Sequence, residues 1–450
     1  MNEEAINWPR SNPHPSLTYL EPDPPLQGQT LYLGGEIGPD RNIYCIPGHA
    51  SRVLAIYPND DDDDDKCIQI GPVFHGKYKW LRAIRANNDV IYGLPCHADS
   101  ILRIDARRKK SNGINSSNGV SITTIPIPYN KDYFDNEQEQ KEEKDMIWKY
   151  HGGAISPIDN CIYCIPQSAS RVLRINPNDE SISFVGPKLP GKYKWYGGVV
   201  GKSDGAIYGV PQNSGSVLRI CPMRTKDGDG FDVNVTLHGD LGIDMHQWHG
   251  AGASSDGTII CIPNNANTVL IVKPPTLNNE DDEHNQKSDD PILTIIGGTD
   301  VVATGNNIGR SDRKYKYLGA TSDNNGNVYC FPSGAERVLR VNTSSLTVDE
   351  IGPSLYESKL ERLKQNKWQN GFYCPVDNCV YGIPLASETV LKIDLNQNDN
   401  DGHPVVTTMQ LPEPFHVLAK WEGGVMIEDG TMYCMPNNFK KVLRIKPSKR

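Results

Sequence analysis

The sequence predicts an all-β fold: an eight-bladed β-propeller with four antiparallel strands in each blade. Two observations carry this prediction. One short motif recurs eight times along the 450 residues, and a further β-like run separates most of its copies. The copies are spaced by about fifty residues, and a repeat of that length with four strands is typical of propellers.

The copy at residues 194–222 shows the motif clearly. Trp195 begins a short apolar run that contains Gly197-Gly198, and Asp204-Gly205 follows as a hairpin signal, since glycine tolerates a positive φ. The second strand ends at Pro211, because proline cannot donate a hydrogen bond to a neighbouring strand. A polar loop then leads to a third strand. Both faces of these strands are apolar, so each sheet should be covered on both sides.

Each copy of the motif can be identified by the proline that ends its second strand. These prolines are Pro47, Pro95, Pro166, Pro211, Pro263, Pro332, Pro384 and Pro436. A Val-Leu or Ile-Leu pair follows each of them and marks the third strand. The runs that supply fourth strands are 67–70, 121–127, 181–185, 233–237, 292–296, 346–351 and 405–411.

The two ends of the chain predict how the ring closes. The eighth copy ends near Pro447 without a fourth strand, and an unassigned β-like run occupies residues 16–20. We expect this run to pair with the last blade, because folded sheets avoid a bare edge. Residues 1–15 are expected to be a flexible tail. Residues 16–450 are expected to form a single propeller domain, with blades that begin near residues 32, 80, 150, 195, 248, 317, 368 and 421.

Several insertions interrupt the repeat. Six consecutive acids at residues 60–65 predict a solvated turn. Residues 132–145 predict a surface helix or a disordered segment, and residues 354–366 predict a short amphipathic helix. Together with residues 299–314, the last two insertions connect a fourth strand to the next first strand. In a propeller these connections share one face with the loops that follow the prolines, so we expect function on that face.

The charge, the cysteine content and the lack of long apolar runs disfavour several classes of function and location. The net charge is −9 and no basic stripe is present, which argues against nucleic-acid binding. Cysteine and glycine alternate at one position of the second strand, which predicts a small buried slot. Eleven cysteines without a disulfide framework favour a reducing compartment. No apolar run predicts a signal peptide or a membrane span. We therefore expect a soluble, intracellular, cytoplasmic and monomeric protein.

An aromatic residue opens the first strand of every copy, and lysine precedes it in six. The aromatic side chains predict packing between blades or an aromatic ring at the channel mouth. Six converging lysines would form a positive collar that suits an anionic ligand or an acidic peptide; solvated or cross-blade-paired lysines are the alternative. The residues are Tyr32, Trp80, Tyr150, Trp195, Trp248, Tyr317, Trp368 and Trp421, with Lys79, Lys149, Lys194, Lys316, Lys367 and Lys420.

The residue after the aromatic is not fixed, and variation at one position of a repeat marks a candidate site. His151, His249 and Glu422 are candidates for a metal or acid–base site near the axis, although no two of them lie in adjacent blades. At this position Gln369 and Glu422 are such neighbours. His49 and His97, which follow their prolines, are a second candidate pair. The full set at the variable position is Leu33, Leu81, His151, Tyr196, His249, Leu318, Gln369 and Glu422.

The motif resembles NHL-type propeller repeats. The resemblance rests on residues 197–199, the Asp204-Gly205 hairpin, Ile207-Tyr208 and residues 217–220, and it covers almost the whole chain. The motif is also similar to streptogramin-lyase and gluconolactonase-like propellers and, more distantly, to kelch repeats. It departs from NHL repeats where proline replaces the aspartate after the second strand. The resemblance implies a fold and, for NHL relatives, protein or RNA binding. No catalytic set of the lyases or lactonases can be matched residue by residue.

These observations favour a non-catalytic propeller that binds a protein or peptide on the face that carries the lysines and aromatic residues. Two alternatives stay open. One is a hydrolase or lyase with a divalent metal in the channel, and the other is a binder of a small anionic or carbohydrate ligand. No cofactor is predicted for the favoured function, and the sequence does not decide whether the protein is an enzyme.

Overall fold

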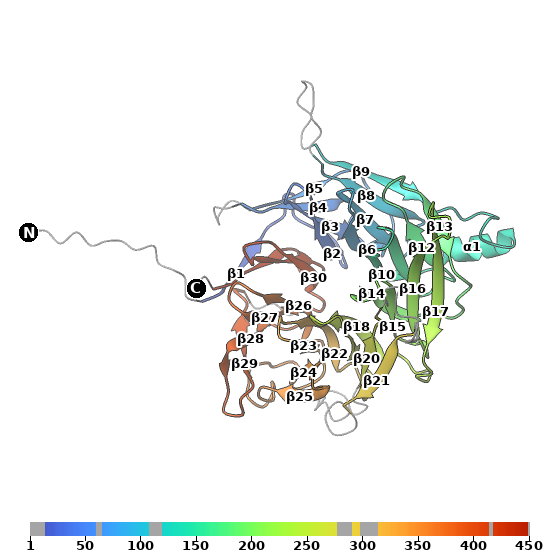
Figure 1. The fold of residues 1–450 in the computed structure, drawn as a ribbon. Helices are drawn as coiled ribbons and strands as arrows, with labels where there is room; N and C mark the ends of the chain where they lie inside the picture. Colours follow the sequence, from blue (N-terminus) through green and yellow to red (C-terminus); the bar gives the residue numbers. More distant parts are fainter. Residues whose placement is uncertain are drawn as a thin grey trace, which may run out of the picture.

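Eight four-stranded antiparallel sheets stand around a common axis, as the sequence predicts (Figure 1). The structure is a computed structural model, and it describes residues 14–59, 65–107, 119–276, 290–297, 314–413 and 417–448. The first strand of every blade contacts the first strands of both neighbouring blades, which closes the ring around the axis. These inner strands are β2 (Tyr32–Ile37), β6 (Trp80–Arg85), β10 (Tyr150–Ile155), β14 (Trp195–Val200), β18 (Trp248–Ala253), β22 (Tyr317–Ser322), β26 (Trp368–Cys374) and β30 (Trp421–Met426).

The second and third strands form the middle of each blade, and every second strand ends at its proline. The second strands are β3 (Ile43–Pro47), β7 (Val90–Pro95), β11 (Ile162–Pro166), β15 (Ile207–Pro211), β19 (Ile259–Pro263), β23 (Asn327–Pro332), β27 (Cys379–Pro384) and β31 (Met432–Pro436). The third strands are β4 (Val53–Tyr57), β8 (Ser100–Asp105), β12 (Val172–Ile175), β16 (Val217–Arg224), β20 (Val269–Lys273), β24 (Val338–Asn342), β28 (Thr389–Asn398) and β32 (Val442–Lys446).

The outer strands complete the blades, and the first strand of the chain supplies one of them. They are β5 (Lys66–Ile70), β9 (Ser121–Pro126), β13 (Ile182–Val185), β17 (Phe231–His238), β21 (Ile292–Ile296), β25 (Thr347–Ile351), β29 (Pro404–Gln410) and β1 (Ser16–Leu20). β1 pairs antiparallel with β32, with Ser16 opposite Lys446 and Leu20 opposite Val442. The predicted closure of the ring by an N-terminal strand is therefore confirmed.

An ion pair between the first and last blades supports this closure. Asp65, at the start of the first blade's outer strand, accepts hydrogen bonds at 2.9 Å from the Arg444 guanidinium and from the Tyr433 hydroxyl. Its side chain is only 1% exposed, so the prediction of a solvated turn is wrong for Asp65. The remaining acids of that run lie outside the described residues.

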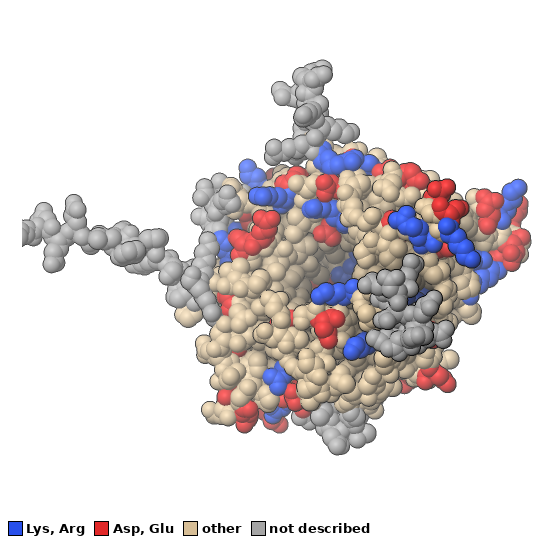
Figure 2. All heavy atoms as spheres, in the orientation of Figure 1, with Lys and Arg blue, Asp and Glu red and all other residues tan. Residues whose placement is uncertain are grey.

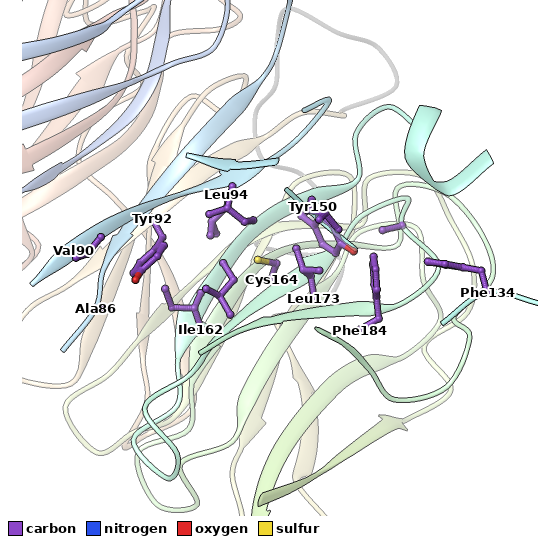
Figure 3. Packing of buried hydrophobic residues seen from close by; sticks show 14 residues of the cluster. Ala86, Val90, Tyr92, Leu94, Phe134, Tyr150, Ile162, Cys164, Leu173 and Phe184 are labelled. Carbon is purple, nitrogen blue, oxygen red and sulfur yellow. The ribbon is translucent and has the colours of Figure 1, made fainter. Parts of the chain in front are cut away.

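Apolar side chains from neighbouring blades form the core at each junction. Figure 3 shows the junction between the second and third blades, where Tyr92 and Leu94 of β7 meet Ile162 and Cys164 of β11. Cys164 occupies the predicted cysteine-or-glycine slot. All eleven cysteines of the sequence lie among the described residues, are buried and form no disulfide there, as expected of small apolar side chains that serve packing.

The three insertions between blades differ in how well their predicted structure agrees with the observed one. Residues 132–145 contain α1 (Glu137–Asp145), which Asn136 caps by accepting a hydrogen bond from the Glu139 amide at 2.9 Å. The predicted helix at 354–366 is wrong: this segment forms turns, and Lys359 has a φ of +63°. Glu361 is buried there and accepts a hydrogen bond from the Thr389 hydroxyl, so tertiary contacts override the local apolar pattern. Most of the insertion at 299–314 lies outside the described residues.

No helix in the described part of the chain is long and apolar enough to cross a membrane.

Candidate functional site

The six repeated lysines lie inside the blade junctions. Their exposed fractions are 0–4%. The Lys194 ammonium donates hydrogen bonds to the carbonyls of Ala169 and Gln167 in the preceding blade and of Gly191. Lys79 makes the same contacts with Gly48, Ala50 and Gly76. The remaining four lysines also donate to backbone carbonyls. Lys149 donates to His97 and Ala98, and Lys316 donates to Asn265. Lys367 donates to Lys364, and Lys420 donates to Ala386 and Ser387.

These contacts correct the positive collar predicted from the sequence. Five of the ammonium groups have a pKa that burial lowers to about 8, and these belong to Lys79, Lys149, Lys194, Lys367 and Lys420. Carbonyls of the preceding blade hydrogen-bond four of these buried charges, and the Glu336 carboxylate of the preceding blade pairs with the fifth, Lys367, at 3.7 Å. The lysines therefore hold neighbouring blades together, and their ammonium groups lie inside the junctions instead of forming an exposed collar.

The aromatic residue after each lysine is also structural. All eight are buried to 2% exposure or less. The five indole nitrogens donate to a carbonyl at or just before the third strand of the same blade; for Trp195 the acceptor is Ser216 at 2.8 Å. The packing interpretation of this position is thus the one that the geometry supports.

The residue before each lysine position is a feature that sequence reasoning missed. In all eight copies it has a positive φ, between +47° and +57°. Its carbonyl accepts a hydrogen bond from the second residue after the proline, as between Tyr193 and Asn213. These positions and the loops after the prolines therefore share one face of the wheel, which we call the mouth face. The residues are Thr30, Tyr78, Trp148, Tyr193, His246, Tyr315, Asn366 and Ala419. Their variation among the copies was the signal that could have found them.

Five aromatic side chains occupy this position in five consecutive blades. Tyr78 lies 4.3 Å from His49, 5.3 Å from His97 and 4.7 Å from Trp148, measured between ring centroids. His49 and His97, the candidate pair, are thus joined through Tyr78. Burial lowers the pKa of His97 to about 4, so its imidazole is neutral at physiological pH. The mouth face carries an aromatic cluster of neutral rings.

The candidate residues at the variable position meet near the axis in two groups. The rings of His151 and Tyr196 stack at 3.6 Å, and those of Tyr196 and His249 lie 3.7 Å apart. Glu422 accepts hydrogen bonds from the Gln369 amide at 3.1 Å and from the Asn437 amide at 3.0 Å. Figure 2 shows the wheel hollowed near its centre.

Burial shifts the pKa values of His151, His249 and Glu422. It lowers the pKa of His151 well below its usual range and that of His249 to about 3, and the nearby Arg82 charge adds to both shifts. Burial also raises the pKa of Glu422, which the Arg82 charge and the Gln369 hydrogen bond oppose. Both imidazoles are therefore neutral at pH 7.

The geometry does not assemble His151, His249 and Glu422 as metal ligands. The Tyr196 ring contacts both imidazoles, and side-chain amides hold both oxygens of Glu422. Across the described ranges, no three His, Cys, Asp or Glu side chains gather in a way that could hold a metal ion.

Comparisons with known proteins support the fold. A scan of protein-family models found no match, and a search of curated proteins found none either. Among solved structures, a streptogramin B lyase is similar with a TM-score of 0.50 and 11% identity, over 98% of this chain and 100% of that one. Sqt1 of Saccharomyces cerevisiae is similar with a TM-score of 0.59 and 8% identity, over the same shares. At these identities both likenesses show the propeller fold alone.

Proposed function

We propose that this propeller is a scaffold that binds a protein or peptide partner on its mouth face. The observation that carries the proposal is a group of exposed apolar side chains there, which we call the apolar sector: Tyr193, Ile243, Met245 and Tyr315. Ile243 is 85% exposed and Met245 is 61% exposed. Large apolar side chains at such exposure, held on a rigid scaffold, are typical of surfaces that a partner covers.

Hydrogen bonds connect the sector across three consecutive blades. The Asn213 amide donates to the Tyr193 carbonyl, and the Asn213 side chain accepts from the His246 amide at 2.8 Å. The Asn265 side chain donates to the Met245 carbonyl at 2.8 Å and accepts from the Tyr315 amide at 2.9 Å. The backbone that carries Tyr193, Met245 and Tyr315 is therefore held in place before a partner arrives, which lowers the entropic cost of binding.

The chemistry of the mouth face indicates the kind of partner. Tyrosine, tryptophan and methionine are the residue types enriched where protein interfaces are buried, and this face presents all three. The lysine–aromatic pairs predicted as the contact surface are buried, so the partner would instead contact the residues that precede them. A segment with apolar anchors fits this surface better than a purely acidic one.

A pair of charged substitutions tests the proposal. We expect Ile243→Glu with Met245→Glu to lower the amount of co-purified partner at least about tenfold, because a buried contact would then desolvate two carboxylates. The measurement is quantitative affinity capture with crosslinking, from the cells that produce the protein. The matched control is Leu237→Glu with Ile292→Glu, which charges two exposed apolar residues on the outer strands β17 and β21.

Each outcome bears on the proposal. Retention of the partner by the control and its loss from the mouth-face variant supports it. Equal retention by both variants, or the absence of any captured protein with the unaltered chain, contradicts it. Equal unfolding midpoints of the two variants show that the loss is not one of folding.

A further inference from the structure

Two residues break the repeat at one axial position. The second residue after the opening aromatic is glycine in six of the eight copies: Gly34, Gly152, Gly197, Gly250, Gly319 and Gly423. In the second blade it is Arg82, and in the seventh it is Asn370. Both of these residues line the same pocket.

The glycines are needed because the inner strands approach closely at this level. A Cβ atom added to Gly152 would lie 3.1 Å from the Gly197 Cα atom, and one added to Gly34 would lie 2.7 Å from the Leu81 carbonyl oxygen. A Cβ atom on Gly423 would meet the Arg82 guanidinium at 3.1 Å. The six glycine blades thus leave the axial space to Arg82 and Asn370, and Arg82 is the cationic side chain of this layer.

The pocket beside Arg82 measures about 250 Å³. The rings of His151, Tyr196 and His249 form one part of its wall, and Ile84, Leu94 and Val199 make another part apolar. No carboxylate lines it. Its polar groups are Arg82, the two imidazoles, the Tyr196 hydroxyl and the Asn370 amide, so it combines one fixed positive charge with aromatic and aliphatic surface.

Arg82 has capacity to bind a further group. Its guanidinium donates a hydrogen bond to the Leu33 carbonyl at 3.3 Å and interacts with the Tyr196 hydroxyl, which leaves further N–H groups for a ligand. Among the described residues, Arg82 forms no close ion pair, although the Glu422 carboxylate lies near enough to interact with its charge. A guanidinium has five N–H donors and matches a carboxylate through two parallel hydrogen bonds. The Nδ1 atom of His151, a residue only 7% exposed, also has no hydrogen-bond partner among the described residues.

We propose that the axial pocket is a binding site for a small monocarboxylate with an apolar or aromatic body, whose carboxylate pairs with Arg82. The Glu422 carboxylate interacts with the Arg82 charge and offsets part of it, so the site favours a monoanion over a dianion. The aliphatic side chains and the stacked rings would contact the body of the ligand. This site does not depend on the partner proposed for the mouth face.

Benzoate is the probe that tests this site. We expect isothermal titration calorimetry to show saturable binding of benzoate at one site per chain. Benzamide, which has nearly the same shape without the charge, is expected to bind at least about tenfold more weakly. Inorganic phosphate, which is largely a dianion at pH 7.5, is expected to bind more weakly than benzoate.

Two variants of Arg82 locate the site. Arg82→Gln removes the charge, and Arg82→Gly introduces the residue that six other blades carry at this position, so at least the second variant should fold. Both are expected to weaken benzoate binding about tenfold or more. The control is Arg85→Gln, which removes the same charge from the same strand, outside the pocket.

The possible results of these titrations either support or contradict the axial site. Loss of binding in both Arg82 variants with retention in Arg85→Gln supports the site. Equal affinity for benzamide and benzoate, unchanged affinity in the Arg82 variants, or no binding of benzoate at millimolar concentration contradicts it. These readouts use no partner protein, so failure here leaves the proposal for the mouth face intact.

Discussion

Deletion of residues 1–20 is expected to lower the free energy of unfolding by roughly 5 kcal/mol, from the sum of about five lost backbone hydrogen bonds and two or three partly buried side chains. The deletion removes β1, so the last blade would expose the full length of β32. The Tyr19 ring lies 6.0 Å from that of Trp421 and 5.1 Å from that of Phe439, and it would be lost as well. A change of this size approaches the whole stability of many proteins.

Denaturant unfolding followed by tryptophan fluorescence measures this effect, and light scattering detects association through the bare edge. The control is deletion of residues 1–13, which removes none of the residues that pair with β32. We expect this shorter deletion to leave the unfolding midpoint within error. Equal midpoints for the two deletions would show that the N-terminal strand does not close the ring.

Lys194→Met is expected to cost about 2–3 kcal/mol, the second-largest effect among these predictions. The substitution keeps an unbranched apolar chain in the junction, but it leaves the carbonyls of Ala169 and Gly191 without their donor. The Gln167 carbonyl keeps the hydrogen bond that it accepts from the backbone amide of residue 194. Each unsatisfied buried carbonyl costs about 1–3 kcal/mol, and the removal of a buried charge offsets part of that sum.

The control for this variant lies two residues upstream. Lys192 is exposed, and Lys192→Met should change stability by less than about 0.5 kcal/mol, as substitutions at exposed sites usually do. Urea unfolding of both variants makes the comparison. A junction variant as stable as the surface variant would mean that Lys194 does not hold the blades together.

The repeat made most of the fold predictable. Eight copies of a motif with an Asp-Gly or related turn and a terminal proline defined the number of blades, and the unpaired run at 16–20 defined how the ring closes. Both predictions are confirmed because they depend on local patterns that recur. The segment 354–366 shows the limit: its leucines suggested a helix, but Leu355 packs into the core of a blade junction and Glu361 accepts a hydrogen bond from Thr389 of β28. These tertiary contacts decided its path.

The candidate site was harder to predict, because a sequence does not say which way a repeated side chain points. Lysines in six copies suggested a collar, yet all six are buried, and five of their ammonium groups reach backbone carbonyls of the preceding blade. The stack of His151, Tyr196 and His249 joins blades whose variable residues looked too far apart. Arg82 was missed as well, although its place in a column of glycines was visible in the sequence.

The central claim is that the repeated lysine–aromatic pair holds the wheel together and leaves binding to the residues beside it. Acetylation of the native protein, followed by mass spectrometry of each lysine, tests this claim most directly. Lys79, Lys149, Lys194, Lys316, Lys367 and Lys420 should react at least about tenfold more slowly than the exposed Lys77 and Lys192, because a blade junction must open before they react. A pKa lowered to about 8 would make most of these amines react faster if they were accessible, so rates equal to those of Lys77 and Lys192 would contradict the claim.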